Sequence, residues 1–84
     1  MYVLASGTFT ERDKLAPHLT DEIAKVHQLR DRGIIPRPYR RADGSGVELL
    51  LDVSSFEDAR EQLSQLPLAK AGLLAFDFTE LVEL

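Results

Sequence analysis

The side chains best suited to binding a small anion are three arginines within one short segment, Arg37, Arg40 and Arg41. A guanidinium holds a carboxylate through two parallel hydrogen bonds, so such a cluster could bind an organic acid. The competing interpretation is an exposed or subunit-interface salt bridge, which contributes little to stability or binding. The sequence leaves both interpretations open.

The other reactive side chains exclude several kinds of site. Cysteine is absent, which excludes disulfides, thiolate metal sites and a cysteine nucleophile. His18 and His27 are nine residues apart, which places them about 180° apart around a helix, so they cannot act together on one face. No histidine–carboxylate grouping has metal-ligand spacing, and we expect no metal site. Ser45 lies in a predicted hairpin turn, which is neither a nucleophile elbow nor long enough for a phosphate loop.

Length and charge restrict the overall class of protein. The 84 residues fit a single domain, 1–84, which is marginal in stability without a partner subunit. A net charge of −4 and a pI near 5.0 argue against nucleic acid as a partner. No segment has the composition of a signal peptide or the length of a membrane span, so we expect a cytoplasmic protein that does not bind a membrane.

The first half of the chain predicts a strand, a helix and an irregular edge strand. Residues 1–9 favour a strand, and the apolar spacing after Pro17 predicts a helix over 17–32. Gly33 suits the left-handed cap at the end of that helix. Pro36 and Pro38 both lie in the segment 34–41, which predicts a strand at the edge of a sheet.

The second half predicts a hairpin partner, a capped helix and a final strand. Residues 42–46 form the turn, and 47–53 is the best candidate for a buried strand. Ser54 or Ser55 caps the next helix, with Glu57 or Asp58 completing a capping box, and the segment 66–68 ends it. Apolar alternation over 74–78 predicts a half-buried strand.

The resulting order, βαββαβ, predicts an α+β ferredoxin-like fold in which two helices cover one face of a four-stranded antiparallel sheet. The other face would remain open. A domain of this size buries such a face against a second copy of itself, so we expect a homodimer with its sheets face to face, a dimeric α+β barrel.

Several short motifs resemble the muconolactone Δ-isomerase family. The segment 52–55, DVSS, is followed by a helix and then by 65–68, QLPL, with the same arrangement and the same spacing from Gly33 as in that family. Asp21-Glu22 and Leu29 resemble an Asp-Glu pair and a Leu on the family's first helix, and Tyr39-Arg40 an aromatic residue followed by Arg. The segment 17–19, PHL, is a weaker match to the broader YCII-like group.

The resemblance implies a proton shift in a small lactone or organic acid of aromatic-compound catabolism, without metal or organic cofactor. It also implies a dimer that assembles into a larger ring. Such a reaction needs a general base and donors for the enolate oxygen. On this basis Glu22 is the candidate base, Arg40 anchors the substrate carboxylate and Tyr39 donates to the enolate or covers the pocket. Arg37 and His18 complete the candidate substrate-binding residues.

Each role has a structural alternative. Glu22 lies near a helix start, where a carboxylate is favoured in any case. Tyr39 could instead pack against a partner subunit. Three function classes therefore remain: a lactone or organic-acid isomerase, a non-catalytic ligand-binding or assembly module, and a cofactor-independent monooxygenase. The fold is compatible with all three, and whether Glu22 and Arg40 face one cavity is the feature that discriminates between them.

Overall fold

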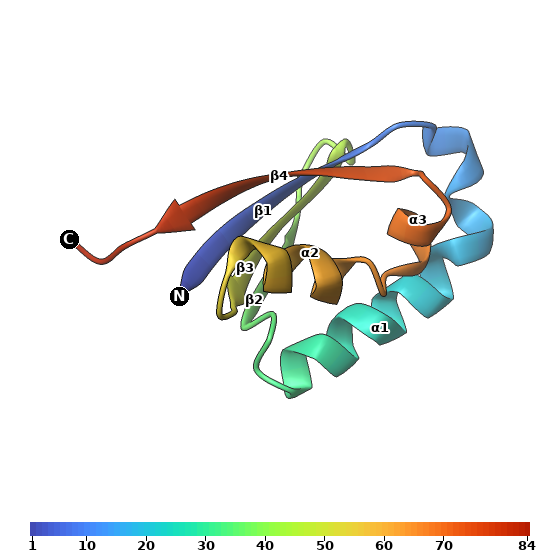
Figure 1. Cartoon of the computed structure of the whole chain (residues 1–84). Coiled ribbons are helices and arrows are strands. Elements are labelled where there is room, and N and C mark those ends of the chain that lie inside the picture. Colours follow the sequence, from blue (N-terminus) through green and yellow to red (C-terminus); the bar gives the residue numbers. More distant parts are fainter.

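The computed structural model describes all 84 residues as a four-stranded antiparallel sheet with helices on one face (Figure 1). The strands are β1 (Tyr2–Phe9), β2 (Arg37–Arg40), β3 (Gly46–Asp52) and β4 (Leu74–Leu81). The helices are α1 (Leu19–Asp31), α2 (Phe56–Leu63) and α3 (Pro67–Lys70), and two single 3-10 turns span Arg12–Lys14 and Ala16–His18. This is the predicted ferredoxin-like fold, with one more short helix than expected.

The sheet has the strand order β2-β3-β1-β4, so β1 lies at its centre between β3 and β4. Ala5 is opposite Leu49 on β3 and Phe78 on β4, and all three point towards the helices. Successive side chains on a strand point to opposite faces, so Leu4 and Leu50 lie on the open face. The core therefore forms between the sheet and the helices and comprises 14 buried apolar residues.

Helix α1 is shorter than predicted because Pro17 belongs to the separate 3-10 turn that precedes it. Gly33 follows the helix with a φ of +77°, the left-handed conformation that was expected there. The apolar spacing that predicts this helix is an apolar stripe formed by Leu19, Ile23, Val26 and Leu29. Leu29 is fully buried, whereas Ile23 is 54% exposed. The stripe is therefore only partly a core surface.

Strand β2 is the predicted edge strand, although it is shorter than the segment 34–41. Ile35 is fully buried and its N–H donates to the carbonyl of Leu29 at the end of α1, whereas the carbonyl of Ile34 accepts a hydrogen bond from the Asp52 N–H on β3. Residues 34–36 therefore link the end of α1 to β3 without continuing the regular pairing of β2. Pro36 consequently lies outside the strand. Pro38 lies within it, opposite Leu49.

The capping of α2 follows the prediction, whereas the end of the helix does not. The Ser55 hydroxyl accepts a hydrogen bond from the Asp58 N–H at 3.0 Å, and the Asp58 carboxylate accepts one from the Ser54 N–H, also at 3.0 Å. The helix ends at Leu63, and Pro67 begins α3 instead of ending α2. Proline is well suited to the first position of a helix, where its missing N–H is not needed.

Candidate functional site

A cavity of about 430 Å³ lies on the helix side of the sheet, between α1 and the hairpin of β2 and β3. Eight of its twelve lining residues are hydrophobic, so its wall suits the body of a small organic molecule. The apolar wall includes the following side chains: Phe9, Leu19, Ile23, Val26, Val47 and Leu49. Four titratable residues also line it: Glu22, His27, Tyr39 and Arg40.

Glu22 is the buried charged residue of the protein, with 8% of its surface exposed. Its Oε1 accepts a hydrogen bond of 2.9 Å from the N–H of Leu68 at the start of α3. This bond joins two segments that carry the sequence resemblance, the Asp21-Glu22 pair and the QLPL segment 65–68. Glu22 therefore has a structural role in connecting α1 to α3.

The second carboxylate oxygen of Glu22 remains available to a ligand. No protein group donates a hydrogen bond to Oε2, and the chain contains no fully buried side-chain oxygen without a partner. Oε2 therefore keeps some exposed surface, and Glu22 is one of the residues that line the cavity. A carboxylate with one oxygen held and the other open is well placed to accept a proton.

The surroundings of Glu22 raise its pKa above the ordinary value of 4.5. Burial is the main cause, because removal from water disfavours the charged form. The hydrogen bond from Leu68 and the nearby charge of His18 act in the opposite direction and favour the carboxylate. A raised pKa strengthens a carboxylate as a base.

Arg40 brings a positive charge, and His27 an imidazole, to the same cavity. Arg40 is opposite Val47 on β3, which places its side chain on the helix side of the sheet. It is exposed and forms no salt bridge within the chain. An unpaired guanidinium at the edge of an apolar cavity can bind a carboxylate.

Tyr39 borders this cavity, but its side chain begins on the other face of the sheet. Its opposite residue on β3 is Glu48, which lies on the open face, and Tyr39 is 59% exposed. A direct contact with a ligand in the cavity therefore requires its ring to reach around the edge strand. The structure gives less support to an enolate donor at Tyr39 than to an anion site at Arg40.

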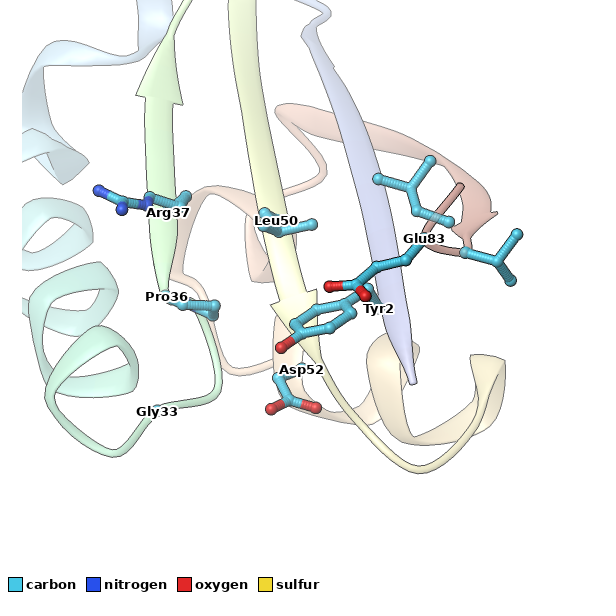
Figure 2. Close-up of a pocket in the computed structure, with 9 residues that line it drawn as sticks. Tyr2, Gly33, Pro36, Arg37, Leu50, Asp52 and Glu83 are labelled. Atoms are coloured by element: carbon cyan, nitrogen blue, oxygen red, sulfur yellow. The ribbon is translucent and has the colours of Figure 1, made fainter.

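Arg37 and His18 do not line the cavity. Arg37 is opposite Leu50 on the open face and borders a different recess of about 440 Å³, together with Tyr2, Leu50 and Asp52. In that recess its guanidinium points away from Tyr2 and Leu50 (Figure 2). His18 precedes α1 and acts on Glu22 through its charge. Neither residue lines the cavity that contains Glu22, and their substrate-binding roles stay predictions.

Arg41, the third member of the arginine cluster, is engaged within the chain. Its Nε donates to Glu48 Oε2 at 2.7 Å, its Nη2 to Ser6 Oγ at 2.9 Å and its Nη1 to Thr8 Oγ1 at 3.1 Å. Ser6 in turn donates to Glu48 at 2.9 Å. Arg41 therefore belongs to a polar network on the open face. For this arginine the structure favours the salt-bridge interpretation over the binding of an anion.

The sequence reasoning did not identify His27 or the apolar wall as part of the site. Leu19, Ile23 and Val26 follow the helical spacing of three and four residues, and that spacing was interpreted only as evidence for a helix. A titratable residue one turn after Ile23 on this stripe, His27, was the available signal. Whether His27 lines a cavity or packs in the core depends on how completely the sheet covers α1, which the sequence does not show.

Sequence comparisons and structural comparisons give different results. No family model matches the sequence, and no curated protein matches it. Solved structures do match. A muconolactone isomerase superimposes with a TM-score of 0.78 at 22% identity, over 99% of this chain and 90% of the other. The chain has the fold of muconolactone isomerase.

A second protein with the muconolactone isomerase fold is equally similar in structure. The 5-chloro-2-hydroxyhydroquinone dehydrochlorinase TftG from Burkholderia phenoliruptrix AC1100, in complex with 2,5-dihydroxybenzoquinone, superimposes with a TM-score of 0.78 at 18% identity. The match covers 98% of this chain and 94% of TftG. At these identities the likeness establishes the muconolactone isomerase fold and leaves substrate and mechanism open.

No three His, Cys, Asp or Glu side chains come together in an arrangement that could hold a metal ion. None of the helices has the length and apolar character needed to cross a bilayer.

Proposed function

We propose that this protein is a muconolactone isomerase-like enzyme that shifts a proton within a small organic acid or lactone. Glu22 acts as the general base, and Arg40 binds the substrate carboxylate. The observation that carries the proposal is that these two side chains, from α1 and β2, line one largely apolar cavity. An isomerase requires its base and its anion-binding residue to line the same cavity. If each residue had only a structural role, the two would not need to meet.

The geometry supports a defined sequence of proton movements. A substrate held by Arg40 would present its carbon acid to the open Oε2 of Glu22, which removes the proton and becomes a neutral carboxylic acid. The electrons move onto the adjacent carbonyl oxygen to form an enolate, and His27 or Arg40 can donate to that oxygen. Glu22 then returns the proton to a different carbon, so the base is regenerated and no other reactant is needed.

The names of the two structural neighbours are consistent with a base in this fold. Isomerisation of a lactone moves a proton between carbons, and dehydrochlorination removes a proton together with chloride. Both names also describe small oxygenated rings, a class that fits a cavity of about 430 Å³. We therefore extend the candidate substrates to muconolactone-like acids and hydroxylated quinones.

The decisive experiment measures proton exchange between these substrates and deuterated water by NMR, with wild type, Glu22→Gln and Asp21→Asn. Glutamine keeps an oxygen for the Leu68 N–H but cannot accept a substrate proton, so the rate should fall by about 10²- to 10⁴-fold. Asp21 is exposed and lies outside the cavity. Asp21→Asn removes the same charge as Glu22→Gln, so this control variant should retain the wild-type rate. Equal rates for wild type and Glu22→Gln would refute the base assignment.

A non-catalytic binding module is the alternative that this experiment separates from the enzyme. Its support is the hydrogen bond from Leu68, which gives Glu22 a structural function of its own. If the protein is a binding module, an organic acid should bind to it and Arg40→Met should weaken that binding. None of the tested acids and quinones should then exchange protons with the deuterated water.

We also propose that the protein forms a homodimer through the open face of the sheet. Tyr2 and Leu81 lie opposite each other on that face and are 45% and 39% exposed, with the half-buried Leu4 and Leu50 beside them. The neighbouring polar groups of Arg41, Glu48 and Ser6 already satisfy one another, so covering them leaves few unpaired donors. Both features favour association with a second copy.

A further inference from the structure

Helix α1 contributes two polar side chains to the candidate cavity, Glu22 and His27, at opposite margins of its wall. An α-helix advances about 1.5 Å and about 100° per residue, so His27 lies about 7.5 Å further along the axis than Glu22 and about 140° around it. The apolar residues of α1 that line the cavity fall between these two around the axis: Leu19, Ile23 and Val26. A small molecule against this wall therefore meets a carboxylate at one margin and an imidazole at the other.

The chain holds these two polar groups differently. Glu22 is fixed to the start of α3 by the hydrogen bond of 2.9 Å from the Leu68 N–H. His27 is exposed and takes part in neither of the side-chain hydrogen bonds of α1, which are that of Glu22 and the one between Lys25 and Gln28. It forms no salt bridge either. Both ring nitrogens of His27 are therefore free of protein partners beside the cavity that it lines.

His27 is also the cavity residue best suited to transfer a proton to a substrate oxygen. The Arg40 guanidinium donates hydrogen bonds but does not give up its proton. The Tyr39 side chain begins on the other face of the sheet, opposite Glu48. Histidine gains and loses a proton readily at neutral pH, which is why it often serves as a general acid. The polar groups of the cavity thus suit three tasks: a base at Glu22, an anion anchor at Arg40 and an acid at His27.

We propose that His27 is the general acid of the site, which binds and protonates the carbonyl oxygen of a substrate whose carboxylate Arg40 holds. As Glu22 removes a proton from carbon, the electron pair of the C–H bond forms a C=C bond. The carbonyl π pair forms an O–H bond with the proton of the His27 imidazolium, and a neutral enol results. Glu22 then returns its proton to a different carbon, and the imidazole takes back the enol proton. Both groups are restored, and no co-reactant is needed.

This inference rests on the proposed proton shift and narrows its substrates. They are organic acids with a second oxygen, carbonyl or hydroxyl, placed apart from the carboxylate. One end of such a molecule binds Arg40 and the other oxygen binds His27.

The first measurement is binding, which does not depend on turnover. The probes are benzoate and para-hydroxybenzoate, whose hydroxyl stands for the enol oxygen, and calorimetry gives the Kd of each. Wild type should prefer the hydroxylated acid roughly 3- to 10-fold, the effect of one added hydrogen bond. His27→Ala should abolish this preference, whereas Arg40→Met should weaken the binding of both acids and keep it. The control Lys25→Ala, on a separate recess of α1 outside the cavity, should bind both acids as wild type does.

The second measurement is the rate of proton exchange for a substrate that the wild type converts. Glutamine keeps an N–H donor but cannot transfer a proton, so His27→Gln should lower kcat about 10²- to 10⁴-fold and change KM little. Arg40→Met should give the opposite split and raise KM, and the control Lys25→Gln should change neither. A merely structural role of His27 would not separate kcat from KM in this way.

The outcomes distinguish the role of His27 from the reaction itself. Equal affinities of wild type for the two acids, an unchanged preference in His27→Ala, or an unchanged kcat in His27→Gln would each refute the assignment. If His27→Ala abolishes the preference but no protein, wild type included, exchanges protons with any acid, the oxygen site at His27 holds and the proposed proton shift fails.

Discussion

Arg40 and Arg41 are adjacent in sequence but lie in opposite environments. Arg40 projects to the helix side and lines an apolar cavity without a salt-bridge partner, whereas Arg41 projects to the open face and bonds to Glu48, Ser6 and Thr8. Their acidic counterparts differ in the same way. Burial raises the pKa of Glu22, and the hydrogen bond from Arg41 lowers the pKa of Glu48. Arg40 on the helix side is left available, whereas Arg41 and Glu48 on the open face pair with each other.

The difference shows how an arginine cluster divides between binding and structure. A guanidinium whose donors are all engaged within the chain has no capacity left for a ligand. A guanidinium without a salt bridge, at an apolar cavity that Glu22 also lines, has both the donors and the setting for an organic acid. The following predictions test this contrast, beginning with the largest expected effect.

The open face should bury enough apolar surface to hold two chains together. At about 25 cal/mol per Å², an interface of standard size stabilises a complex by more than a small domain's own marginal stability. Leu4→Glu should dissociate the dimer because it places a charge on this face opposite Leu50 and Thr79, neither of which can pair with it. Sedimentation should give twice the 9.4 kDa chain mass for wild type and for the exposed-turn control Ala42→Glu. A folded wild-type monomer at micromolar concentration would exclude the dimer.

Arg40→Met should weaken the binding of an organic acid while leaving the fold unchanged. A hydrogen bond to a charged group contributes about 1.5–3 kcal/mol, so KM or Kd should rise roughly 10- to 150-fold. Titration calorimetry with the carboxylate ligand, beside a urea unfolding curve, measures both quantities. Unchanged affinity would remove Arg40 from the site.

Arg41→Met should have the opposite profile. It removes the donors that satisfy Glu48, Ser6 and Thr8, at a cost of about 1–3 kcal/mol in the free energy of unfolding. Urea denaturation should show that loss at an unchanged affinity for the acid. An Arg41→Met protein that is fully stable but fails to bind would reverse the assignments of the two arginines.

Glu22 and Glu48 should affect the pH dependence of stability in opposite directions. These effects should be smaller than those of the substitutions above. The raised pKa of Glu22 means that its contribution to stability is complete below the ordinary value of 4.5 and is lost as pH rises through the higher folded value. The lowered pKa of Glu48 gives a contribution that is present above 4.5 and is lost as pH falls through the lower folded value.

The corresponding glutamine variants provide the measurement. At neutral pH Glu22→Gln should be at least as stable as wild type, because it removes a charge that burial disfavours, and the difference should shrink below 4.5. Glu48→Gln should be less stable at neutral pH and should approach wild type in acid. Parallel pH profiles for the two variants would contradict the contrast between the faces.

The order of the elements could be predicted because each depends on local signals. Apolar alternation marks the strands, Ser55 caps α2, and Gly33 ends α1 with the expected positive φ. The start of α3 at Pro67 was missed, because proline both ends and begins helices and only the following residues decide which.

The grouping of residues around the candidate cavity could be anticipated from the sequence only in part. The pairing of Glu22 with Arg40 came from the family resemblance, whereas the burial of Glu22 depends on Leu68, 46 residues away, and no local pattern reports it. The separation of the arginines was accessible. Residues 37, 39 and 41 share one face of a strand and residues 38 and 40 the other, so the period of two already placed Arg40 apart from Arg37 and Arg41.

The position of β1 at the centre of the sheet has a consequence for the way the chain folds during synthesis. Tyr2 pairs with Leu81, so the first strand made must wait for the last one before the sheet is complete. At typical rates of translation this delay is roughly 4–16 s. Until then one edge of β1 has no partner, and an unpaired apolar strand edge promotes association with other chains. Slow release or crowding of nascent chains should therefore reduce the yield of this protein more than it reduces that of an all-helical domain of similar length.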